Sequence, residues 1–160
     1  MATLAGAFLA AIGGRLGTEF ESYTVRYGAP DDSGLYVENA SVITVRYSYE
    51  TAEVQGNQLG SPEIVSPRVM VSIRRQFSGD STALAVHQSL LDLAADVRLA
   101  IADLVLDHAD GTAPISGFAT NLWFTGSATT PATVDIGATG STESVTIEFT
   151  FRYIRNTGAR

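Results

Sequence analysis

The chain has 160 residues, 45% of them hydrophobic, and its formal charge is −7. It has no cysteine, and all ten basic side chains are arginine because lysine is absent. This composition excludes thiol nucleophiles, thiolate metal sites, disulfides, Walker-type phosphate lysines and Schiff-base lysines. With only two histidines, a three-histidine zinc site is excluded as well. A chain of this length is expected to form one domain with its own core.

The first predicted element is an amphipathic helix at the N-terminus. Its apolar stretch is shorter than the roughly 20 residues that cross a bilayer, and no basic side chain precedes it. We therefore expect a helix docked on the core rather than a targeting signal. Gly13-Gly14 and Gly17 predict that the helix ends there. Its apolar stripe consists of Leu4, Phe8, Ile12 and Leu16.

Three strands are predicted next. Residues 23–27 and 43–49 alternate with period two, and Tyr47 and Tyr49 fall on the packed side of their strand. Residues 29–35 between them form a turn cluster. Residues 51–62 show no period, so we expect a long loop or hairpin tip with a contact role. The third strand, at 68–75, places alternate residues on one apolar face.

The strongest local pattern is a long central helix that ends near His108. Asp80 or Ser81 can cap its start, and Asp110-Gly111 followed by Pro114 predicts its end. Its apolar stripe consists of Val86, Leu90, Leu93, Val97, Ile101 and Leu104. The carboxylates that lie largely off this stripe are Asp92, Asp96, Asp103 and Asp107.

Two or three strands complete the chain. Residues 115–124 form a mixed strand, and the Gly- and Thr-rich residues 125–142 surround a short strand at 133–136. Uninterrupted alternation at 145–153 predicts a strand with one wet and one packed face. These patterns predict an α+β fold, in which an N-terminal helix and a long central helix cover one face of a mixed or antiparallel sheet. We expect a single domain over residues 1–160, with loop insertions near 51–62 and 125–143.

No motif in the sequence predicts catalysis, a metal or a cofactor. There is no phosphate loop and no nucleophile elbow. Asp107-His108 lacks the further oxygen ligands of a calcium loop and is interpreted as a polar helix end. His87 is interpreted as a surface or interface histidine, and the face of Trp123 is left open. The carboxylate pairs Asp31-Asp32 and Glu50/Glu53 fit solvated turns better than the acid pair of a hydrolase.

The charges are distributed unevenly. Arg26, Arg46, Arg74 and Arg152 occupy outward positions in separate strands, whereas the long helix is acidic. Solvated faces are the default interpretation, but in an oligomer such faces can meet as complementary surfaces. The acidic total argues against a sequence-independent grip on DNA.

The order of elements resembles that of the tail terminator proteins of long-tailed phages, the group of the lambda minor tail protein U. The resemblance rests on the strand at 41–50, the strand at 67–77, the helix at 82–108 and the aromatic strand at 144–153. The chain departs from the pattern at 21–39 and 125–143.

This resemblance implies a structural virion protein of the tail or neck, assembled in the host cytoplasm, without enzyme activity, cofactor or membrane. Such proteins form a ring, usually a hexamer, that caps the tail tube protein, ends its polymerisation and joins it to the head-side connector or stopper protein. DNA passes through the lumen without specific binding. The alternatives are a tail tube protein, a neck or head-completion protein, a carboxylate-based enzyme, and a small-ligand-binding α+β domain. The candidate contact residues are Arg46, Gln55, Asn57, Gln58, Arg74, Arg75, Asp92, Asp96 and Arg152.

Overall fold

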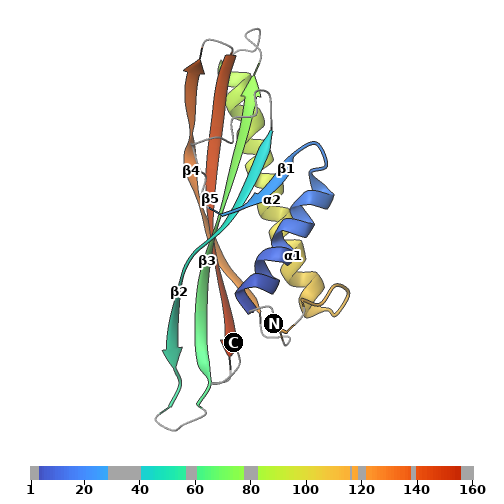
Figure 1. Cartoon of the computed structure of the whole chain (residues 1–160), viewed down its shortest axis with the longest axis vertical. Coiled ribbons are helices and arrows are strands. Elements are labelled where there is room, and N and C mark those ends of the chain that lie inside the picture. Colours follow the sequence, from blue (N-terminus) through green and yellow to red (C-terminus); the bar gives the residue numbers. More distant parts are fainter. Residues whose placement is uncertain are drawn as a thin grey trace.

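A computed structural model describes residues 4–28, 41–56, 61–77, 83–115, 117–118, 122–137 and 140–155. Its five-stranded sheet has the order β1-β2-β3-β5-β4, with β1 parallel to β2 and every other pair antiparallel. Both helices pack on the same face of the sheet (Figure 1). The predicted α+β fold is confirmed. The elements are α1 (Leu4–Glu19), β1 (Thr24–Tyr27), β2 (Val42–Val54), β3 (Glu63–Phe77), α2 (Ala83–Ala109), β4 (Trp123–Gly137) and β5 (Gly140–Arg155).

The core fills the space between the helices and the sheet. Most of the described stripe residues are buried there against alternate residues of β2, β3 and β5: Phe8, Ile12 and Leu16 of α1, and Leu90, Val97, Ile101 and Leu104 of α2. Phe8 of α1 meets Phe151 of β5 edge to face, with ring centres 4.7 Å apart. Each such side chain contributes about 1.5–3 kcal/mol through burial, so this layer sets the position of every other element. The two-layer core follows directly from the periods of 3.6 and 2 in the sequence.

The predicted end of α1 at its glycines is wrong, because the helix continues to Glu19. Ile12 and Leu16 are fully buried on either side of the glycines. Gly13 also permits a close approach, since a Cβ at this position would lie 2.0 Å from the hydroxyl of Tyr27. Tertiary packing of the stripe therefore outweighs the cost of about 1 kcal/mol that each glycine adds to a helix.

The stretch at 51–62, predicted as a long loop or hairpin tip, belongs to the β2–β3 hairpin, and strands occupy most of its described residues. Val54 of β2 pairs with Glu63 of β3, and residues 57–60 lie outside the described part of the chain. Figure 1 shows this hairpin reaching beyond the helices. Residues 50–56 are all exposed, so neither side of β2 is selected for apolar residues and no period appears there. We call residues 50–56 and 61–64 the arm.

A bulge in β2 corrects the prediction for Tyr49. The register shifts between Tyr47 and Tyr49, so that Tyr47 faces the helices and Tyr49 faces the opposite side. Tyr49 is accordingly 46% exposed, whereas Tyr47 is partly buried against the core. A bulge adds one residue to a strand and reverses the side on which all later residues lie.

The predicted insertion at 125–143 is also wrong as a loop, because β4 runs through it and pairs along most of β5. The expected short strand at 133–136 is one part of this longer strand. Conversely, the predicted strand at 115–124 begins only at Trp123, and the described residues before it form no strand. As an edge strand with partly exposed sides, β4 tolerates small and polar residues that give no clear period.

The predicted end of α2 is confirmed. Gly111 has a φ of +74°, and its N–H donates to the carbonyl of His108 at 3.2 Å. This left-handed residue after the last turn is the usual role of a terminal glycine. The predicted caps Asp80 and Ser81 lie outside the described residues. In the part of the chain that the structure covers, no helix combines the length and apolar character needed to cross a membrane.

Candidate functional site

The face of the sheet opposite the helices, which we call the open face, is rich in arginine. Arg26, Arg46, Arg74 and Arg152 alternate along their strands with core residues, which places them on this face as predicted. Arg68 joins them because it lies two residues from Met70, the partner of Arg46. Among the described side chains, the carboxylates that share this face are Glu53 and Glu148. The open face is therefore basic, although the whole chain is acidic.

Arg68 and Arg46 contact neighbouring side chains on the open face. Arg68 donates to Glu148 at 2.7 Å, and its guanidinium lies 5.0 Å from the centre of the Tyr49 ring. Arg46 lies 3.1 Å from the sulfur of Met70. The Arg68–Glu148 pair is 40% and 31% exposed, so it contributes at most about 1 kcal/mol. Five arginines against two carboxylates leave the described side chains of this face with a formal excess of three positive charges.

An open groove of about 480 Å³ lies where β4 begins. Trp123, whose face the sequence left undecided, lines it together with Ile64, Arg152 and Ile154. Trp123 is 46% exposed and Ile154 is 40% exposed. We call this hollow the Trp123 groove. It is an apolar surface with a guanidinium beside it, a composition that is common in protein interfaces.

The outer surface of α2 carries the predicted acidic residues. Asp92 and Asp96 are exposed and line a second open groove of about 480 Å³. Arg75 also lines this groove but lies on the helix side of the sheet. It donates to Ser89 of α2 at 2.6 Å and to the hydroxyl of Tyr23 at 3.4 Å. Arg75, a predicted contact residue, thus connects the sheet to α2 within one subunit.

A buried carboxylate lies near the start of α2. Glu143 of β5 is 1% exposed, and its Oε1 lies 3.5 Å from Nδ1 of His87. Its Oε2 has no hydrogen-bond partner within the described residues. Strand pairing places Glu143 directly beside Arg75. No sequence pattern pointed to Glu143, because it follows a Gly- and Thr-rich stretch that is predicted to be a loop.

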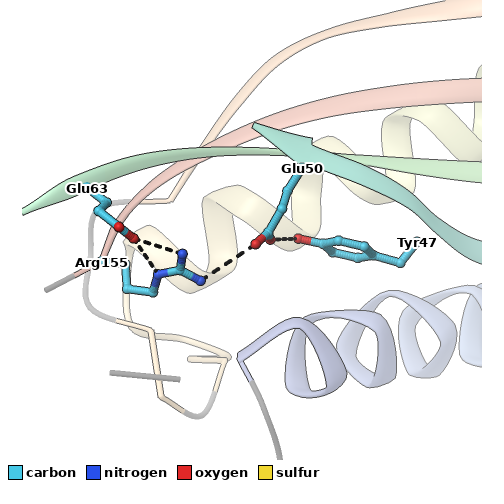
Figure 2. Close-up of polar contacts among 4 residues, drawn as sticks. All are labelled: Tyr47, Glu50, Glu63 and Arg155. Atoms are coloured by element: carbon cyan, nitrogen blue, oxygen red, sulfur yellow. Dashed lines mark hydrogen bonds and ion pairs between the residues drawn. The ribbon is translucent and has the colours of Figure 1, made fainter. Parts of the chain in front are cut away.

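The base of the arm is held by a polar cluster (Figure 2). Arg155 donates from Nε and Nη2 to Oε2 of Glu63, at 3.1 and 2.8 Å. Its Nη1 lies 3.7 Å from Oε1 of Glu50, whose other oxygen accepts a hydrogen bond from Tyr47. The cluster joins β2, β3 and β5 at the point where the sheet leaves the helices. Gln55 lies farther along the arm and is exposed, whereas Asn57 and Gln58 lie outside the described residues.

The pKa values of Tyr47, Tyr153 and Arg155 are all raised, so each keeps the proton that it can donate in a hydrogen bond. Burial raises the pKa of Tyr47, and its hydrogen bond to Glu50 adds to the effect. Burial also raises the pKa of Tyr153, which lies beside the same carboxylate. The hydrogen bond to Glu63 raises the pKa of Arg155. The cluster is therefore a fixed link at physiological pH rather than a proton-transfer site.

His108 and Asp107, which were considered as metal ligands from the sequence, both have structural partners. Nδ1 of the buried His108 accepts the N–H of Ile115 at 2.9 Å, and this bond closes the turn after α2. Asp107 pairs with Arg15 of α1. Asp31 and Asp32 lie outside the described residues. Across the described ranges, no three His, Asp or Glu side chains gather in a group suited to a metal ion.

Sequence reasoning missed Arg68, Glu148, Glu63 and Arg155. Glu63 and Arg155 are 92 residues apart, so no local pattern connects them. Arg68 and Glu148 occupy polar positions in strands that alternate, so their place on the open face could have been predicted. Their ion pair could not, because it depends on the register between β3 and β5. Long-range register is the information that a single sequence lacks.

No protein-family model matches the chain, and no curated protein matches it. Among solved structures, a chain from the "Virion of native gene transfer agent (GTA) particle" is similar, with a TM-score of 0.36 and 14% sequence identity. The match covers 96% of this chain and 97% of that chain. A likeness at this TM-score assigns neither a family nor a function.

Proposed function

We propose that this chain is a structural virion protein that assembles into a ring at the end of a phage-type tail tube, as tail terminators do. The ring ends tube polymerisation and joins the tube to a head-side connector or stopper protein. The order of elements in the sequence motivates this assignment. It needs no catalytic group and no cofactor.

One structural observation carries the self-assembly part of the proposal: the subunit has two opposite faces of opposite charge. The open face carries five arginines against two carboxylates among its described side chains, and the outer surface of α2 carries exposed Asp92, Asp96 and Asp103 against one exposed arginine, Arg98. Because these faces belong to different layers, one subunit cannot satisfy both by itself. Two different faces that meet between copies make a head-to-tail contact, which closes into a ring when its rotation allows.

Two further features fit this role. The arm projects beyond the helices, so it can reach a neighbouring ring or the tube (Figure 1). The charge of −7 on each subunit disfavours adhesion of DNA phosphates to the lumen through which DNA passes.

The proposal is tested on the purified full chain by mass measurement in solution, followed by negative-stain imaging. We expect closed rings, with six copies as the leading stoichiometry, and shorter tubes when the rings are added to polymerising tube subunits. Long tubes formed by the chain alone would identify it as a tube protein instead. A monomer at all concentrations would overturn the proposal.

The role of charge is tested in the same assay. Charge reversal at Asp96 (Asp96→Arg) or at Arg74 (Arg74→Glu) is expected to weaken assembly. It should also make the remaining assembly less sensitive to salt concentration. Unchanged assembly in both variants would show that the opposite charges of the two faces do not drive it. Circular dichroism confirms that each variant is folded.

A further inference from the structure

The outer surface of α2 carries a row of apolar side chains in addition to its carboxylates. Leu91, Leu99 and Leu106 are 39%, 61% and 59% exposed. At about 100° per residue, the three leucines lie within an arc of roughly 80°, so they form one row along the helix. Ala95 lies in the same arc and is exposed as well. Single exposed leucines are ordinary, but an aligned row on one helix face marks an interaction surface.

The acidic residues of α2 border this leucine row on one side. Asp92, Asp96 and Asp103 follow it by a small rotation about the helix axis, and all three are exposed. Within the described part of the chain, no ion pair or hydrogen bond engages them. The helix thus presents an apolar strip with negative charge along one edge.

The Trp123 groove has the complementary arrangement. Its apolar lining comes from Ile64, Trp123 and Ile154, and Arg152 stands exposed beside them. No ion pair to Arg152 is present in the described ranges. The groove is on the open face, because Trp123 pairs with Arg152. The row is on α2, and Figure 1 shows that α2 lies against the other face of the sheet. The two surfaces therefore lie on opposite sides of the same subunit.

We propose that the leucine row of one copy docks in the Trp123 groove of the next copy, with Arg152 facing the acidic border. This inference rests on the proposed ring and names the contact that builds it. Charge complementarity selects a second copy as the occupant, because the basic open face and the acidic helix are features of this same chain. It also fixes the contact as head-to-tail rather than two-fold symmetric.

The size of the two surfaces agrees with such a contact. A stable interface buries about 800 Å² on each partner, which is close to a tenth of the 9204 Å² surface of the subunit. The leucine row runs from Leu91 to Leu106, so it is about 22 Å long and about 10 Å wide and presents roughly 220 Å². The row therefore supplies about a quarter of the area, and the acidic border of α2 and the arginines of the open face are available for the rest.

A complementation experiment tests this contact on the full chain. Leu99→Asp destroys the row but leaves the groove intact, and Trp123→Ser destroys the groove but leaves the row intact. Each variant alone is expected to lose the ring and run as a monomer in native mass spectrometry. A mixture of the two restores a single competent contact, so it should give a dimer with one copy of each variant and nothing larger.

Matched controls separate this contact from general damage. Val54→Asp alters a side chain on the arm whose exposure (52%) lies between those of Leu99 and Trp123, and it should keep the parental ring. Circular dichroism spectra show whether each variant is folded. The inference is overturned if Leu99→Asp keeps the ring, or if the mixture of folded variants contains only monomers. A parental chain that is itself monomeric would instead refute the proposed function, and with it this contact.

Discussion

The ion pair at the base of the arm gives a prediction that can be worked out from the structure. Arg155 and Glu63 are joined by two hydrogen bonds of 2.8 and 3.1 Å. Their side chains are only 22% and 21% exposed, so solvent screens the pair less than an ordinary surface ion pair. A hydrogen bond to a charged group contributes about 1.5–3 kcal/mol. Since both bonds share one acceptor oxygen, we expect a coupling free energy near the lower limit, about 1.5 kcal/mol.

A double-mutant cycle with Arg155→Met and Glu63→Gln measures this coupling through urea unfolding at one fixed subunit concentration. Arg155→Met should be the more destabilising single change, because it also removes the guanidinium beside Glu50. The control cycle uses Arg68→Met and Glu148→Gln. This ion pair has a similar nitrogen–oxygen distance, 2.7 Å, but its side chains are 40% and 31% exposed. It should give about 0.5 kcal/mol. A coupling at Arg155–Glu63 no larger than that of the control would refute the argument from burial.

Three further predictions concern stability. Gly14→Ala should stabilise the protein by about 1 kcal/mol, because its Cβ meets nothing within 4 Å, whereas Gly13→Ala should gain less or destabilise because its Cβ would lie 2.0 Å from the Tyr27 hydroxyl. Thermal unfolding compares them, and an equal gain from both would contradict the close approach. The folded pKa of Tyr47 lies above its unfolded value of 10.0, so its contribution is complete below pH 10 and is lost as the pH rises further. Tyr47→Phe should therefore cost about 1 kcal/mol at pH 7 and reduce the fall in stability above pH 10; an unchanged alkaline profile would exclude this role. His108→Leu should cost about 1–3 kcal/mol in urea unfolding, because it leaves the buried N–H of Ile115 without its acceptor, while His108→Asn should cost less because an acceptor remains; equal losses would argue against the hydrogen bond.

The elements that the sequence predicted well are those with one wet and one buried side. Leu90, Val97 and Ile101 repeat at helical spacing because the sheet covers only one side of α2, and Phe149 and Phe151 alternate because the helices cover only one side of β5. The strands of the arm lack a period because water reaches both of their sides. The length of these strands therefore follows only from the pairing of β2 with β3 in the structure.

The candidate surfaces were predicted in part. The outward arginines and the acidic helix followed from alternation, since each can be assigned within a single element. The leucine row was not predicted. Leu91, Leu99 and Leu106 lie on the side of α2 away from the core, and the helical pattern identified only the side that is buried. Tyr49 was misplaced because the bulge beside it arises from pairing with β3. The Trp123 groove combines β3, β4 and β5, whose adjacency no single segment encodes.

The twist of the sheet has a consequence for the number of copies in the proposed ring. If the leucine row and the Trp123 groove were parallel planes on opposite sides of a flat slab, successive copies would stack in a straight line. Strands in a sheet rotate by about 20–25° from one to the next, and Figure 1 shows this twist. The groove lies at the start of β4, which forms one edge of the sheet. This rotation turns the groove relative to α2, and a ring of six requires about 60° per contact. Ring size is then a property of backbone geometry, and changes that alter the twist of the sheet, such as removal of the β2 bulge, would alter the number of subunits that close the circle.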